Sequence, residues 1–116
     1  MTTIAVDFDG VIHSYTQGWA DGTVYDQPMP GAVNGLNALM MDYAVYIHTA
    51  RDIEQVSTWL TTLGFRCRTI FEGDFWNTRD ILLVTNRKLP ASAYVDDRGI
   101  RFHSWAQVLI DLPNMV

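Results

Sequence analysis

Five polar side chains stand at or just after the ends of short apolar runs, where they could hold a cation and a phosphoryl group. They are Asp7, Asp9, Thr49, Asp96 and Asp97. Carboxylate and hydroxyl oxygens suit a hard cation such as Mg²⁺, which needs one or two carboxylates with water and phosphate oxygens. Carboxylates about 4 Å apart repel by about 4 kcal/mol at an effective dielectric of about 20, so a cluster must bind a cation or hold protons. The pattern predicts a Mg²⁺ site, and the alternative is that each aspartate simply opens a turn.

Basic residues and a glycine turn lie near the same positions. Arg51 comes two residues after Thr49, and Lys88, with Arg87 before it, follows another apolar run. A cation, a lysine and a hydroxyl form a receptor for phosphoryl oxygens, and the turn at residues 8–10 adds backbone N–H donors because its glycine permits a close approach. For Arg51 and Arg87 the alternative is a solvated surface position. The expected phosphate contacts are Phe8, Gly10, Thr49, Arg51 and Lys88.

The apolar pattern predicts strands that alternate with helices. The expected strands lie at 4–6, 44–48, 81–84 and 93–95, with a weaker one at 67–71. Helical spacing begins at Ala32, again after the N-cap candidate Asp52 with a stop at Gly64, and near Trp105. Such alternation predicts an α/β, three-layer Rossmann-like fold with a mostly parallel sheet. Ligands of open α/β sheets bind at the carboxyl ends of the strands, so we expect the polar residues to converge there.

Length and composition limit the class of protein. The 116 residues, 48% hydrophobic and 18% charged, predict one domain over 1–116, in which residues 10–30 form a flap-like segment rather than a cap domain. The net charge of −5 argues against a surface that coats nucleic acid. The single cysteine, Cys67, and the lack of a long apolar stretch lead us to expect a cytoplasmic protein that does not enter a membrane.

Four segments resemble the motifs of the haloacid dehalogenase (HAD)-like hydrolases, in the order that this superfamily uses. Asp7-Phe8-Asp9-Gly10-Val11 resembles the first motif and Thr49 the second. Lys88 is similar to the third motif and Asp96-Asp97 to the fourth. Residues 84–90 and 93–99 are similar to those of small capless bacterial and phage members. Only seven residues separate Lys88 from Asp96, which compresses the unit that usually joins the third and fourth motifs.

The resemblance implies a mechanism through an aspartyl-phosphate. Asp7 would be the nucleophile, and Asp9 would protonate the leaving oxygen and then deprotonate the attacking water. Thr49 and Lys88 would bind phosphoryl oxygens, and Lys88 would keep Asp7 ionised. The implied Mg²⁺ ligands are Asp7, the backbone carbonyl of Asp9, Asp96 and Asp97.

We therefore expect a Mg²⁺-dependent phosphatase (a phosphoric monoester hydrolase) that acts on a small phosphorylated metabolite or a nucleotide. Two alternatives stay open: a phosphatase of polynucleotide ends, and a non-catalytic regulatory module that binds phosphate or metal. An uncapped site is compatible with cover from a second copy in a homodimer. The aromatic pairs Tyr15/Trp19 and Phe75/Trp76 either line the substrate mouth or pack on the core. His48 precedes Thr49, so strand alternation assigns it to the opposite face and to a structural role.

Overall fold

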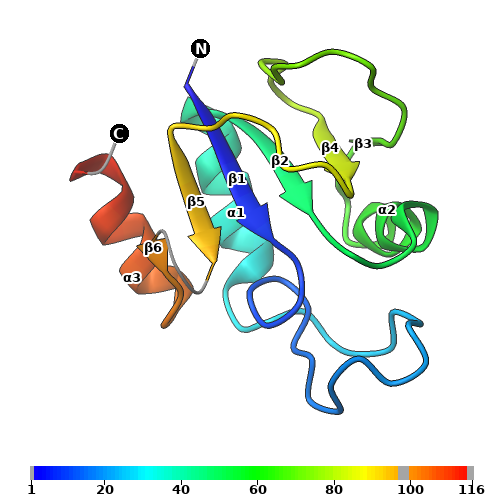
Figure 1. Ribbon diagram of the computed structural model, residues 1–116. Helices are drawn as coiled ribbons and strands as arrows, with labels where there is room; N and C mark the ends of the chain where they lie inside the picture. The colour runs from blue at the N-terminus through cyan, green and yellow to red at the C-terminus, as the bar shows by residue number, and fades with distance from the viewer. Residues whose placement is uncertain (1, 97–99, 115–116) are drawn as a thin grey trace.

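A single parallel sheet organises the chain, in the strand order β3-β4-β2-β1-β5-β6 (Figure 1). The structure, a computed structural model, describes residues 2–96 and 100–114. All pairings between the described strands are parallel. The strands are β1 (Thr3–Asp7), β2 (Ala44–His48), β3 (Cys67–Arg68), β4 (Leu82–Thr85), β5 (Ala93–Asp96) and β6 (Ile100–Arg101).

Most of the predicted strands are confirmed. The strand expected at 81–84 lies one residue later, and β6 was not predicted. The strand expected at 67–71 is reduced to the two residues of β3 at the sheet edge. In the lost part, Ile70 is 81% exposed, and Phe71 packs from the loop against Trp76 in the second core rather than from a strand.

In the described part of the chain, three α-helices begin close to their predicted starts: α1 (Ala32–Asp42), α2 (Ile53–Thr62) and α3 (Trp105–Asp111), which continues into the 3₁₀ turn η1 (Leu112–Asn114). The Asp52 side chain caps α2 by accepting from the N–H groups of Glu54 and Gln55. Beyond the other end of α2, Gly64 has φ +99°, a left-handed conformation that glycine adopts without strain. None of the described helices has both the length and the apolar character needed to span a membrane.

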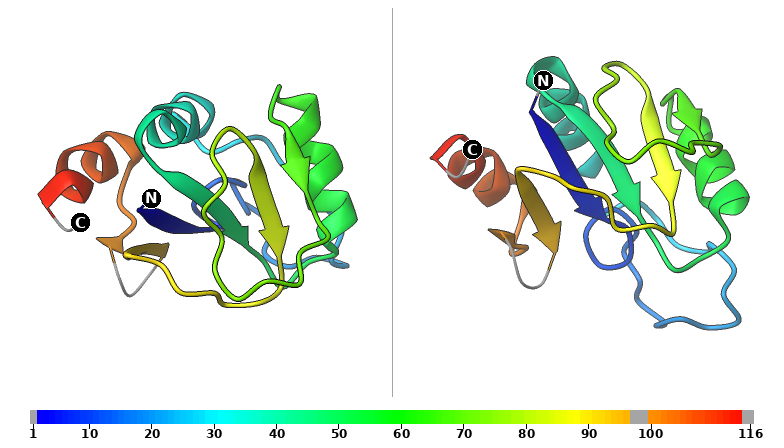
Figure 2. Two further views of the ribbon diagram at one scale, coloured as in Figure 1. Left: turned by 90° about the horizontal axis from the view of Figure 1, so that it is seen from above. Right: turned by 45° about the horizontal axis from the view of Figure 1, so that its top comes forward.

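All three described helices pack on one face of the sheet. Ile4 and Val6 of β1 lie in one core with buried residues of α1, α2 and α3. Ala5, the residue between them, belongs to a second core on the opposite face, where Trp76 and Leu89 come from loops. Figure 2 shows the helices on one side of the strands and loop segments on the other. The described helices therefore form one layer rather than the two that the predicted three-layer arrangement requires.

The short connection between β4 and β5 explains this difference. It comprises residues 86–92 and contains no helix. A helical crossover between parallel strands needs a dozen or more residues. The chain instead crosses the sheet as an extended loop, and loop side chains bury the second face.

Register aligns the polar ends of the central strands. Asp7 pairs with His48 across β1 and β2, and Val6 pairs with Val95, the residue before Asp96, across β1 and β5. The segment at residues 10–30, hereafter the flap, leaves β1 and extends beyond the carboxyl ends of β1 and β2 (Figure 1). The sheet thus places Asp7 and Asp96 at one edge, as the sequence predicts.

Candidate active site

A cavity of about 210 Å³ opens at the carboxyl ends of the central strands. Three residues predicted from the sequence, Asp7, Lys88 and Asp96, line this cavity together with His48 and Tyr94. Asp7 and Asp96 end neighbouring strands, whereas Lys88 lies on the loop that crosses from β4 to β5. The fold therefore brings two carboxylates and one ammonium group, widely separated in sequence, around one small volume.

A second cavity, of about 360 Å³, adjoins the first through shared residues. Asp7 and Asp96 line both, and Asp9, Gly10 and Phe102 line only the second of the two. Asp9, the predicted general acid and base, thus faces a space that Asp7 also faces.

Asp7 is half-buried, and its surroundings act on its charge. Burial raises the pKa of Asp7, and the nearby carboxylates of Asp96 and Asp9 raise it further. The N–H of Phe8, which donates to Asp7 Oδ1 at 3.0 Å, and the nearby His48 lower it. The balance is a carboxylate whose charged form is disfavoured without a cation.

The donor set fits Mg²⁺ with a small number of protein ligands. Among residues 2–96 and 100–114, no group of three or more His, Cys, Asp or Glu side chains is arranged to hold a metal ion. Asp7 and Asp96 supply two carboxylates to the same cavities, and Asp97 lies outside the described residues. Mg²⁺ commonly keeps several waters and takes only one or two carboxylates plus substrate phosphate. Two carboxylates from adjacent strands meet that requirement.

Two tyrosines that sequence reasoning missed hold the loop next to Lys88. The Tyr46 hydroxyl donates to the carbonyl of Leu89 at 2.6 Å and accepts from its N–H at 2.9 Å. The Tyr94 hydroxyl donates to the same carbonyl at 2.8 Å, and the Tyr94 ring centroid lies 5.0 Å from Lys88 Nζ. The Lys88 side chain is exposed. The hydrogen bonds to Leu89 hold the adjacent backbone in place, and this restricts the positions that the Lys88 ammonium group can reach.

Thr49 is placed differently from Lys88. It is only 2% exposed and lines neither cavity. Its Oγ1 accepts the N–H of Arg51 at 3.0 Å, and its carbonyl accepts from Asn86 Nδ2 at 2.7 Å. The hydroxyl thus orders the turn after β2, and its contact with a phosphoryl oxygen stays a prediction.

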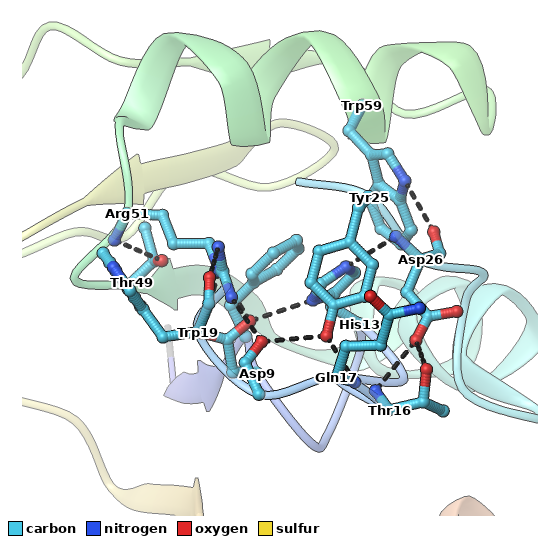
Figure 3. A network of polar contacts seen from close by, with 12 residues as sticks. Asp9, His13, Thr16, Gln17, Trp19, Tyr25, Asp26, Thr49, Arg51 and Trp59 are labelled. Carbon is cyan, nitrogen blue, oxygen red and sulfur yellow. Dashed lines mark hydrogen bonds and ion pairs between the residues drawn. The ribbon is translucent and has the colours of Figure 1, made fainter. Parts of the chain in front are cut away.

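Arg51 is turned towards Asp9 and the flap. Its side chain is buried, and its Nε lies 2.9 and 3.0 Å from the two carboxylate oxygens of Asp9 (Figure 3). Nη1 donates to the carbonyls of Trp19 and Thr23 in the flap. Arg51 does not line the cavity of Asp7 and Lys88. Its described partners are Asp9 and the flap, and its predicted phosphate contact stays a prediction.

The backbone N–H groups of Phe8 and Gly10, in the turn after β1, donate to acceptors within the protein. The Phe8 N–H donates to Asp7 Oδ1, and the Gly10 N–H donates to the carbonyl of His13 at 2.8 Å. Gly10 has φ +79°, which explains why glycine suits this position. Phe8 is 1% exposed and stacks on the His13 ring. The roles of Phe8 and Gly10 in phosphate binding remain predictions.

His48 lies beside Asp7, a neighbourhood that sequence reasoning did not find. Alternation correctly separates it from Thr49, but the register pairs it with Asp7, and both line the same cavity. Alternation within one strand does not reveal this pairing, because it requires the register between β1 and β2.

The aromatic residues divide between core and surface. Trp76 is fully buried and its Nε1 donates to the Val45 carbonyl, whereas Phe75 is 46% exposed. In the flap, Trp19 is 44% exposed and lies with its ring centroid 4.5 Å from Arg51 Cζ. Trp76 and Trp19 thus pack against the protein, and Trp19 also presents a surface to solvent.

The fold and cavities define an α/β protein with carboxylates and a lysine at the carboxyl edge of a parallel sheet. Compared with protein families, curated proteins and solved structures, the chain shows no significant match. The functional assignment therefore depends on the site itself.

Proposed function

We propose that this protein is a HAD-like, Mg²⁺-dependent phosphohydrolase that cleaves a phosphate monoester of a small metabolite or nucleotide. The observation that carries this proposal is the shared cavity of Asp7, Lys88 and Asp96. A carboxylate nucleophile, a cationic phosphate ligand and a second carboxylate, from three separate segments, are groups that phosphoryl transfer to an aspartate uses.

The reaction takes place in two displacements. A carboxylate oxygen of Asp7 attacks phosphorus, the ester P–O bond breaks, and Asp9 gives its proton to the leaving alcohol oxygen. Asp9 then takes a proton from a water molecule, whose oxygen attacks the aspartyl-phosphate. The P–O bond to Asp7 breaks, inorganic phosphate leaves, and both aspartates return to their starting states.

Positive charge must offset the repulsion between Asp7 and the phosphate. The Lys88 ammonium group lines the same cavity and would bind a phosphoryl oxygen. Mg²⁺ held by Asp7 and Asp96 would supply the remaining charge neutralisation and polarise the phosphoryl group. His48 also lines this cavity. In the tautomer that directs a ring N–H into the cavity, His48 would donate a further hydrogen bond to a phosphoryl oxygen.

The test is phosphate release from an aryl phosphate, sugar phosphates, mononucleotides and 3′- or 5′-phosphorylated oligonucleotides, each with Mg²⁺ and with EDTA. The Asp7→Asn variant should lose turnover, and Asp42→Asn is the matched control, because Asp42 is exposed where α1 ends, next to the amino end of β2. A preference for oligonucleotides would favour the polynucleotide alternative. Equal rates for wild type and Asp7→Asn, or rates unchanged by EDTA, would contradict the proposal.

A stable phosphorylated protein would point to the third alternative. If acetyl phosphate phosphorylates Asp7 and the adduct persists without turnover of any monoester, the chain is a phospho-accepting module rather than a phosphatase. Rapid hydrolysis of the adduct supports the phosphatase.

A further inference from the structure

His13, near the start of the flap, is fully buried and connects Asp9 to Asp26, near the other end of the flap. Its Nδ1 lies 2.9 Å from Asp9 Oδ1, and its Nε2 accepts the backbone N–H of Asp26 at 2.9 Å (Figure 3). Because Nε2 accepts a hydrogen bond, the ring proton is assigned to Nδ1, which donates to Asp9. The ring stacks on Phe8 at 5.2 Å between centroids and meets the edge of Trp59. The imidazole therefore has one orientation and two fixed partners.

Arg51 makes the second connection between Asp9 and the flap. Its Nε contacts both carboxylate oxygens of Asp9, while its Nη atoms donate to the carbonyls of Gly18, Trp19 and Thr23. The Trp19 ring covers the guanidinium group. A guanidinium that is 1% exposed needs such partners, since an unpaired buried charge is costly. The flap thus supplies three carbonyl acceptors and the Trp19 ring that keep this cation buried beside Asp9.

The Asp9 side chain is held by protein donors and also lines the second cavity. Its side chain remains 21% exposed and lines the second cavity with Asp7. Its Oδ1 accepts from His13 Nδ1 and Arg51 Nε, and its Oδ2 lies 3.0 Å from the same Nε, so Oδ2 is the oxygen that can carry the proton of a general acid. A general acid must lie within hydrogen-bond reach of the leaving oxygen, so its orientation decides its effectiveness.

We propose that His13 and Arg51 are positioning residues that fix the orientation of Asp9 and make it depend on the flap. The inference rests on the proposed function, in which Asp9 protonates the leaving oxygen. When the outer part of the flap, residues 18–26, is displaced, Arg51 loses its carbonyl and Trp19 partners and His13 loses Asp26, so Asp9 loses its fixed rotamer. The flap therefore controls proton transfer to the leaving group as well as covering the edge of the site.

The test compares two leaving groups in the same Mg²⁺ assay. An alkyl phosphate such as glycerol phosphate needs protonation of its leaving oxygen, whereas p-nitrophenolate leaves readily without it. Arg51→Lys keeps the charge but not the paired contact, and should lower kcat for the alkyl phosphate by about 10²-fold, within the usual contribution of a general acid. The loss on p-nitrophenyl phosphate should be much smaller. A role limited to stability would lower both rates equally.

His13 offers a matched pair of variants. In His13→Asn the amide nitrogen occupies a position near Nδ1 and can still donate to Asp9, whereas in His13→Gln it lies near Nε2 and cannot. Asn should therefore restore most of the alkyl phosphate turnover that Gln loses. Equal effects of the two variants would overturn the positioning role of His13.

A measurement without substrate tests the flap connection. In Arg51→Lys and Trp19→Ala, amide hydrogen exchange should accelerate at the flap residues Thr16, Gly18 and Gly22 and stay unchanged in β2. Gln17→Ala, an exposed flap change, should alter neither exchange nor kcat. Unchanged flap exchange in Arg51→Lys would overturn the connection. If the wild type hydrolyses neither substrate, the proposed function itself fails; equal losses on both substrates overturn only the positioning.

Discussion

The hydroxyl of Tyr46 bonds to both backbone groups of Leu89, donating to the carbonyl and accepting from the N–H. Tyr46 is fully buried in β2, and Leu89 lies in the loop that crosses the second face. Burial raises the pKa of Tyr46, so its hydroxyl stays protonated and keeps both bonds. The two hydrogen bonds hold the loop against the second face of the sheet, where a parallel sheet ordinarily has a crossover helix. They also fix the position of Leu89, the residue next to Lys88.

Tyr46→Phe should destabilise the protein and weaken phosphate binding. The change leaves the buried N–H of Leu89 without its hydroxyl partner, which should lower the free energy of unfolding by about 1–3 kcal/mol. KM for an aryl phosphate should rise because Lys88 is less well held. Urea unfolding and steady-state kinetics measure the two effects. Tyr94→Phe is the control: it removes one bond to the same carbonyl, so its effect should be smaller, and an equal effect would contradict the argument.

Replacing Lys88 should remove activity, whereas replacing its neighbour should not. Lys88→Met deletes the ammonium group in the Asp7 cavity, and kcat/KM should fall by about 10²–10³-fold, the usual cost of losing a donor to developing negative charge. Arg87→Met removes contacts to the carbonyls of Phe71 and Gly73 in the outer loop. Phosphate release under identical Mg²⁺ conditions compares the two. Comparable losses would show that charge alone, rather than position, matters here.

Substitution of Trp76 by alanine should lower the free energy of unfolding much more than the same substitution of its neighbour Phe75. Trp76 is the large side chain that closes the second face, with Nε1 bonded to Val45 and its carbonyl accepting from Thr3. Trp76→Ala should lower the free energy of unfolding by about 3–5 kcal/mol. Phe75→Ala, at a half-exposed position, should change it by about 0.5 kcal/mol. Thermal or urea unfolding decides between them, and equal effects would remove Trp76 from the core.

Local sequence signals were sufficient for the individual elements. Asp52 and Gly64 marked the limits of α2 because a cap and a left-handed glycine act within a single turn. The apolar run that ends at Asp7 marked β1, because a buried strand is a short continuous stretch of apolar residues. Local signals could not predict which face of the sheet the helices cover. That depends on whether a connection between two strands is long enough to contain a helix. Residues 86–92 are too few, and loop residues such as Trp76 cover that face instead.

The site could be predicted only in part. The convergence of Asp7 and Asp96 follows from the rule that parallel strands end at one edge, and Lys88 joins them because it lies on the loop that leaves β4 at that edge. The pairing of Arg51 with Asp9 joins residues 42 apart in the sequence through an irregular flap, and no periodic pattern reports such a contact. The position of His48 beside Asp7 needed the register of two strands.

Asp7→Asn should stabilise the protein in metal-free solution near neutral pH. Because burial raises the pKa of Asp7 in the folded chain, its ionised form weakens folding above the unfolded-chain pKa, and the free energy of unfolding falls as pH rises through the folded value. Asparagine removes this penalty and still accepts the Phe8 N–H. The advantage of the variant should shrink towards about pH 3, below the ordinary aspartate pKa of about 3.9. Thermal unfolding across pH in EDTA measures this.

Added Mg²⁺ should reverse that difference. A cation bound by Asp7 and Asp96 stabilises the folded wild type by mass action and raises its Tm, while Asp7→Asn should respond weakly. Asp42→Asn should respond to Mg²⁺ as the wild type does. A Tm of wild type that is insensitive to Mg²⁺ would argue against a metal site at this edge.

The most direct measurement is the covalent state of Asp7 during turnover. Asp9→Asn still allows attack on a good leaving group such as p-nitrophenolate but slows hydrolysis of the intermediate, since no carboxylate deprotonates the water. After acid quenching in the presence of Mg²⁺, intact-mass analysis should show one added phosphoryl group, and peptide mapping should assign it to Asp7. Turnover without any phosphorylated protein, or a phosphoryl group on another residue, would contradict the account.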